Sequence, residues 1–144
     1  MSVENNVFMR PESLPSPERW AQAITDAGFD LSIDTDFQWD EFEGFLPAKY
    51  KGQEAGFELY KEDFNLSELS KQEQDELGDR SLLITLVTHA DMREYMSSML
   101  ASAVLCAISD GRLAEAGEPP FIKAGDAVQW ARECEPDVER LLKK

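Results

Sequence analysis

Histidine and cysteine are scarce in this sequence, and their scarcity excludes several kinds of chemistry. The 144 residues contain one histidine, His89, and two cysteines, Cys106 and Cys134. A zinc site needs three or four such ligands, and a disulfide scaffold needs more cysteines than two. Cationic residues are also few, with 14 Lys and Arg against 29 Asp and Glu. Since nucleic-acid binding depends on clustered cations, we expect no nucleic-acid partner.

Long apolar runs are missing as well. No stretch approaches the roughly 20 apolar residues of a transmembrane helix, and Met1–Asn6 lacks the pattern of a secretory signal. We therefore expect a cytoplasmic protein with no membrane partner. The chain is 42% hydrophobic and has eight Phe, three Trp and three Tyr. That is enough to build a core without metal or disulfides, so we expect a single domain over residues 1–144.

Hydrophobic periodicity predicts both helices and strands. Ser16 followed by Pro17 is a favourable helix start, and the unbroken apolar run Leu82–Val87 is typical of a central strand. Expected strands cover residues 6–9, 29–33, 44–51, 56–61 and 81–88; expected helices cover 17–27 and 92–109, with a last one starting near 125. This order predicts an α+β fold, with a mostly antiparallel sheet of about four to five strands and two to three helices packed on it.

Glycine and proline positions refine this prediction. Residues 51–56 are expected to form a hairpin loop, and Pro47, which lacks a backbone donor, predicts an edge strand or a bulge. Pro136 is expected to break or restart the last helix. The acidic segment 65–79 is expected to be a loop or a solvated helix between two strands.

No pattern for catalysis or cofactor binding can be written from this chain. Asp34-Thr35-Asp36 begins like a calcium loop, but Trp39 stands where the turn glycine belongs and Phe45 where the bidentate Glu belongs. Cys106 lies on an apolar helix stripe and is expected to be inert core, while His89 is expected to anchor a loop. We therefore predict no catalytic residue, no metal and no cofactor.

Negative charge is concentrated in one part of the chain. Between Asp30 and Asp79 there are 15 acids against four lysines, so this segment carries most of the formal net charge of −15 of the whole chain. Within 34–43 the acids alternate with aromatic residues, a pattern that suits recognition of a basic protein surface. The alternative is that these rings point into the core. The candidate partner-binding residues are Asp34, Asp36, Trp39, Asp40, Glu41, Glu43, Glu54 and Glu58.

The general layout resembles the small acidic immunity proteins that bacteria pair with polymorphic or secreted toxins. The resemblance involves Phe45–Tyr50, Gly56–Glu58, Ile84–Glu94 and an alanine-rich helix ending at Asp110-Gly111. It implies a monomer or homodimer that neutralises a cognate toxin domain with a basic surface, and it assigns no individual residue. Two alternatives remain open: an acidic homodimeric secretion chaperone for an effector, and an enzyme that works through His89.

Overall fold

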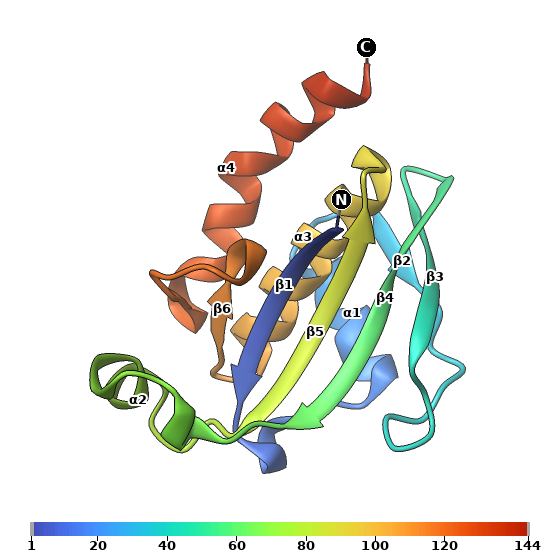
Figure 1. Cartoon of the computed structure of the whole chain (residues 1–144). Coiled ribbons are helices and arrows are strands. Elements are labelled where there is room, and N and C mark those ends of the chain that lie inside the picture. Colours follow the sequence, from blue (N-terminus) through green and yellow to red (C-terminus); the bar gives the residue numbers. More distant parts are fainter. Residues whose placement is uncertain (1, 144) are drawn as a thin grey trace.

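Seven antiparallel strands and four α-helices make up the computed structural model, which describes residues 2–143 (Figure 1). The strands are β1 (Ser2–Met9), β2 (Leu31–Ile33), β3 (Gly44–Tyr50), β4 (Gln53–Asp63), β5 (Leu82–His89), β6 (Arg112–Ala114) and β7 (Ile122–Lys123). The helices are α1 (Pro17–Asp26), α2 (Lys71–Leu77), α3 (Met92–Ile108) and α4 (Ala124–Leu142), with short 3-10 turns η1 (Pro11–Ser13), η2 (Leu66–Glu68) and η3 (Glu115–Gly117).

The strand order is β2-β3-β4-β5-β1-β6-β7. The α+β class is confirmed, but the expected four to five strands and two to three helices were too few. The missed strands β6 and β7 are three and two residues long, too short to show an alternating pattern. Both edges of the sheet, β2 and β7, are also short, which limits unwanted pairing with other chains. Over residues 2–143 no helix has the length and apolar composition that crossing a bilayer requires.

Helices α1, α3 and α4 cover one face of the sheet (Figure 1). Helix α3 lies directly on the sheet, with α1 and α4 packed on its other sides. Every residue from Met96 to Cys106 is buried, so this helix is surrounded rather than half-exposed. That explains its many small residues, because alanine and serine allow close approach from all directions.

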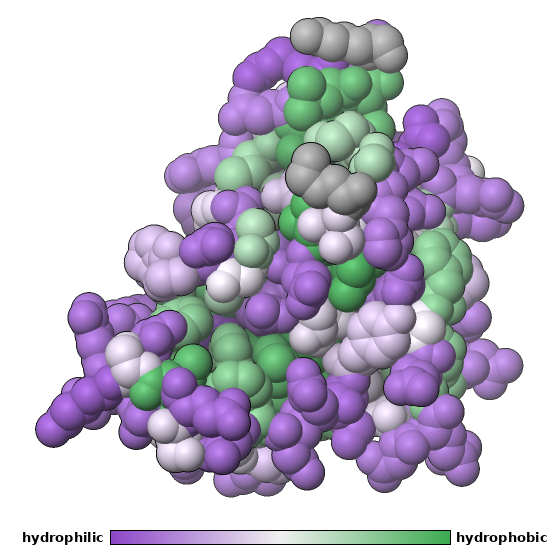
Figure 2. Space-filling model, viewed as in Figure 1, coloured by the Kyte–Doolittle hydropathy of each residue, from purple (hydrophilic) through white to green (hydrophobic). Residues whose placement is uncertain are grey.

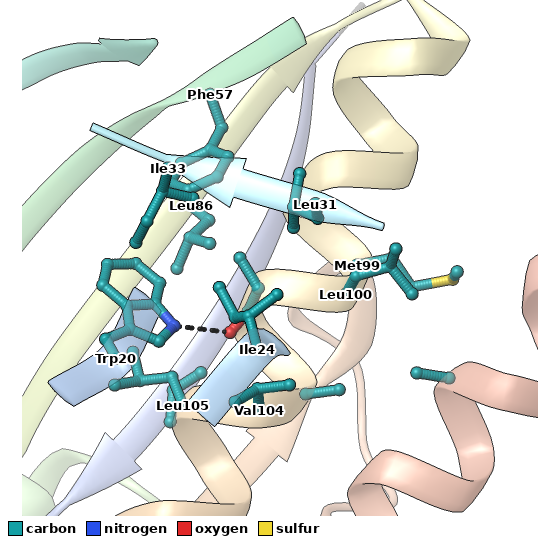
Figure 3. Close-up of a cluster of buried hydrophobic side chains, with 14 of the residues drawn as sticks. Trp20, Ile24, Leu31, Ile33, Phe57, Leu86, Met99, Leu100, Val104 and Leu105 are labelled. Atoms are coloured by element: carbon teal, nitrogen blue, oxygen red, sulfur yellow. Dashed lines mark hydrogen bonds between the residues drawn. The ribbon is translucent and has the colours of Figure 1, made fainter. Parts of the chain in front are cut away.

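The largest buried side chain links two of these layers. Trp20 of α1 is fully buried among Ile24, Phe57 and Leu105, and its indole N–H donates to the carbonyl of Ala101 in α3 at 3.0 Å (Figure 3). Helix α1 begins where the sequence predicts, since the Ser16 hydroxyl accepts a hydrogen bond from the N–H of Arg19.

The other face of the sheet is covered only in its lower half. There a second cluster of buried residues, Phe8, Leu77, Leu83 and Ala114, lies beneath the segment that carries η2 and α2. Figure 2 views this face and shows hydrophobic colour over the lower ends of β1 and β5, beside α2. The acidic segment 65–79 is therefore a short helical excursion that attaches to the sheet through Leu77 and its neighbours. The upper half of this outer face carries no covering element among residues 2–143.

The hairpin between β3 and β4 is tighter than expected. Its loop is only Lys51-Gly52, and both residues have positive φ (50° and 77°), as in a type I′ turn. Strand β4 therefore starts at Gln53, not at Gly56. The expectation of an edge strand at Pro47 was also wrong, because β3 lies between β2 and β4. Pro47 is tolerated since β2 ends at Ile33, opposite Ala48, so the missing donor lies beyond its end.

Helix α4 passes through Pro136 without a break, contrary to the prediction. A proline inside a helix costs about 3 kcal/mol, so contacts beyond it must offset this loss. Val138 is buried against the core. In addition, the Tyr50 hydroxyl contacts the carboxylates of Glu135 (2.7 Å) and Glu139 (2.6 Å), and Glu139 also pairs with Lys51 at 2.5 Å.

This contact predicts a pH-dependent attachment of α4. The bonds from Lys51 and Tyr50 hold the pKa of Glu139 below its ordinary value of 4.5, so their stabilisation is present above that pH and is lost as pH falls through the folded-state pKa. We expect Tyr50→Phe to lower the free energy of unfolding by about 1–2 kcal/mol at pH 7. The difference from wild type should shrink below pH 4.5 in urea titrations. Lys51→Met should follow the same trend, and a difference that stays constant down to pH 3 would contradict it.

Candidate functional site

Strand β4 separates from β5 at Gly56. Pairing between these strands runs from Asp63 to Glu58, whereas Gln53–Phe57 pairs with β3 alone. A side chain from α3 takes the place of the missing strand: the Ser97 hydroxyl accepts from the N–H of Gly56 at 3.2 Å and donates to the carbonyl of Glu94 at 2.7 Å. The sheet therefore opens at its upper end, between the β3–β4 hairpin and the start of α3.

Only glycine fits at the point of separation. Gly56 has φ of +133°, and a Cβ placed there would lie 2.6 Å from the carbonyl oxygen of Leu46 and 2.5 Å from Cζ of Phe45. The Phe45 ring thus rests on the Gly56 backbone instead of in the core, and Phe45 stays 49% exposed. Local backbone geometry places an aromatic ring at the surface.

The opening forms a groove of about 760 Å³, here called the acidic groove. Its sheet side comes from β2, β3 and β4, and its helix side from the first turn of α3. The lining residues are Ser32, Ile33, Asp34, Phe45, Pro47, Ala48, Lys49, Glu54, Ala55, Asp91 and Glu94. The groove therefore combines a partly apolar floor with four carboxylates and one lysine.

Four groove carboxylates have no cationic partner. Within residues 2–143, none of Asp34, Glu54, Asp91 and Glu94 forms an ion pair. Most other carboxylates in this part of the chain are unpaired too, and what distinguishes these four is that they line one groove. Burial raises the pKa of Glu94, and the nearby charge of Asp91 raises it further. With four carboxylates and one lysine, the groove carries a net negative charge, which a bound cation would offset.

A hydrogen-bonded cluster lies beside the groove on the open sheet face. The Tyr60 hydroxyl donates to one carboxylate oxygen of Glu58, and Nε2 of His89 lies 2.6 Å from the other. The bond from Tyr60, then that from His89, lowers the pKa of Glu58. Glu58 is therefore held ionised and oriented, and His89 is tied to the sheet.

The acidic loop between β2 and β3 separates its two kinds of residue. Asp36, Asp40, Glu41 and Glu43 point to solvent, while Phe37, Trp39 and Phe42 are half-buried against the core. The Trp39 ring stacks on Trp20 with centroids 5.6 Å apart, and its N–H donates to the carbonyl of Pro15 at 2.7 Å. These aromatic residues therefore pack on the core and help to stabilise the fold, and they remain partly exposed.

The structure divides the eight candidate residues into three places. Asp34 and Glu54 line the acidic groove, and Glu58 lies beside it. The other five, Asp36, Trp39, Asp40, Glu41 and Glu43, lie in the loop before β3. Sequence reasoning missed Phe45, Asp91 and Glu94. Asp91 and Glu94 stand at the start of a predicted helix, where acidic residues are common. Asp91 does cap α3, since it accepts hydrogen bonds from the N–H groups of Arg93 and Glu94.

The chain matches no protein-family model, no curated protein and no solved structure, so its own side chains carry the evidence for function. Among the residues that the structure describes, no three His, Cys, Asp or Glu side chains are grouped so that they could hold a metal ion. Burial raises the pKa of the Cys106 thiol to about 12, which keeps it protonated and unreactive. A groove with an exposed ring and unpaired carboxylates is suited to binding.

We expect Gly56→Ala to be strongly destabilising, because the new Cβ combines an unfavourable φ with overlap on a backbone oxygen. The free energy of unfolding in urea should fall by about 2–4 kcal/mol. The matched control is Gly125→Ala in the first turn of α4, where no atom lies within 4 Å of a new Cβ. It should leave stability unchanged or raise it by up to about 1 kcal/mol. Equal effects of the two substitutions would contradict this account of the sheet opening.

The hydrogen bonds of Glu58 with Tyr60 and His89 predict how the pKa of Glu58 responds to substitution. Tyr60→Phe removes the largest contribution to the lowered pKa of Glu58, so this pKa should rise toward its ordinary value of 4.5. His89→Gln should raise it less, and Tyr95→Phe, on another element, should leave it unchanged. The measurement is a ¹³C NMR titration of the Glu58 carboxylate, and an unaltered pKa in Tyr60→Phe would disprove the arrangement.

Proposed function

We propose that this protein is an inhibitor that binds a folded, positively charged domain of a toxin, with the acidic groove and the open upper sheet face as its contact surface. The observation that carries the proposal is the set of four unpaired carboxylates around the exposed Phe45 ring. The toxin-neutralising role is supported by the resemblance of the sequence to acidic immunity proteins.

Charge is the first argument. Opposite charges on two proteins raise the rate at which they meet, and like charges exclude wrong partners. Three cations of this chain, Arg10, Arg80 and Arg112, surround Asp110 at the lower end of the sheet. The acidic groove at the upper end has only Lys49 beside its four carboxylates, so it carries a net negative charge that can attract an external partner.

Apolar surface is the second argument. Tight protein interfaces depend on a few buried aromatic or apolar contacts surrounded by polar residues. Phe45 and Pro47 are exposed on the outer face of β3, and Tyr60 and Val87 lie half-buried on the neighbouring strands. Carboxylates flank these residues, as an interface centre with a polar rim requires.

A growth assay tests the proposal. The gene next to this one should encode a protein whose C-terminal domain arrests growth, and co-expression of this chain should restore growth. The double variant Asp34→Lys/Glu54→Lys should fail to restore it and should bind the purified domain about 100-fold more weakly, because two attractive contacts become repulsive. The association rate of wild type should fall as salt increases.

The matched control is Asp75→Lys/Glu76→Lys, which makes the same change in net charge on the exposed surface of α2. It should restore growth as wild type does. Equal loss in both double variants, with both folded by circular dichroism, would show that total charge and not the groove matters. A metabolic neighbour with no toxic product would overturn the proposed role.

The chaperone alternative gives different results in the same experiments. A secretion chaperone should be a homodimer by light scattering and should bind an unfolded effector segment, with no need for a folded toxin domain. The inhibitor should bind the folded domain and lose that binding when the domain is denatured.

A further inference from the structure

We propose that the acidic groove receives an arginine side chain from an extended segment of the partner, with the guanidinium between the carboxylates of β4 and α3 and against the Phe45 ring. This inference rests on the proposed function and specifies the chemistry that the groove recognises.

The volume of the groove suits one long side chain of an extended partner segment. Its volume of about 760 Å³ lies within the range of roughly 300–1,000 Å³ for sites that enclose small ligands. Its lining combines exposed residues of β3, such as Phe45 and Lys49, with Ala48 and Ala55, which are buried. One long side chain can therefore enter while the backbone that carries it remains at the surface.

The floor favours guanidinium over ammonium. Phe45, Pro47 and Ala55 provide apolar contacts, and a guanidinium is more weakly hydrated than an ammonium, so it loses less on entering such surroundings. The Phe45 ring has one side on Gly56 and is otherwise half-exposed. An arginine can stack on such a ring, an arrangement that stabilises a cation by about 0.5–1 kcal/mol.

The walls provide acceptors on two sides. Glu54 lines the groove on its sheet side and Glu94 on its helix side, and the fork of N–H groups on a planar guanidinium offers donors in more than one direction. Asp91 already accepts two backbone bonds through Oδ1, so its second oxygen is the one left for a ligand. Burial, and then the charge of Asp91, raises the pKa of Glu94, and a cation bound beside it would lower that pKa again.

Lys49 is the one cation of this chain at the groove. It forms no ion pair within residues 2–143 and its side chain is exposed, so it can turn to solvent when a second cation enters. Its positive charge nevertheless opposes binding. Removing it should strengthen the interaction, whereas removing either carboxylate should weaken it.

Three short peptides test the inference on the whole chain. They are acetyl-Gly-Arg-Gly-amide, its lysine counterpart and its citrulline counterpart, which has nearly the shape of arginine but no charge. In ¹H–¹⁵N NMR titrations the arginine peptide should cause saturable shifts at Glu54, Ala55 and Glu94. Its dissociation constant should be about threefold lower than that of the lysine peptide and about tenfold lower than that of the citrulline peptide.

Variants of both signs complete the experiment. Glu54→Gln/Glu94→Gln should weaken arginine-peptide binding about tenfold, Lys49→Gln should strengthen it about threefold, and Asp75→Asn/Glu76→Gln on α2 should leave it unchanged. Equal affinities for the arginine and citrulline peptides, or shifts that do not saturate, would overturn the inference. If a toxin domain still binds through Asp34 and Glu54 in that case, the proposed function stands and only the arginine assignment fails.

Discussion

The separation of β4 from β5 at Gly56 is the constraint on which the upper end of this molecule depends. Two backbones can part inside a sheet only if their N–H and C=O groups find other partners. The Ser97 hydroxyl of α3 supplies such a partner. Because Gly56 has no Cβ, the Phe45 ring can lie against the Gly56 backbone on the neighbouring strand. The groove, the exposed ring and the closeness of the α3 start all follow from this arrangement.

Charge is distributed unevenly between the two ends of the sheet. At the lower end, Arg10 bridges Asp79 and Asp110, and the guanidinium of Arg80 is almost fully buried beside them. These contacts join β1, the segment after α2 and the end of α3, so the cations there serve the fold. At the upper end the acidic groove has four carboxylates beside one lysine, Lys49, and this excess of negative charge raises its capacity to attract a positive partner.

Local signals predicted the elements well, and long-range arrangement escaped them. The Ser16 cap, the apolar run of β5 and the α3 helix were all read correctly, because each depends on neighbouring residues. The alternation of acids and rings in the loop before β3 left two interpretations open, and the structure places Trp39 half-buried, with its ring stacked on Trp20 in the core. The groove brings Glu54 together with Glu94, forty residues later, and no periodic pattern records where a strand leaves its neighbour.

The position of β1 affects how the protein is made. This first strand lies between β5 and β6 in the sheet, with its residues Ser2–Met9 paired to His89–Leu82. About 70 residues must be translated after β1 before β5 emerges, which takes about 4–15 s at ribosomal rates of roughly 5–20 residues per second. During that time Val7, Phe8 and Met9, which are buried in the folded protein, lack the strands that flank them in the sheet.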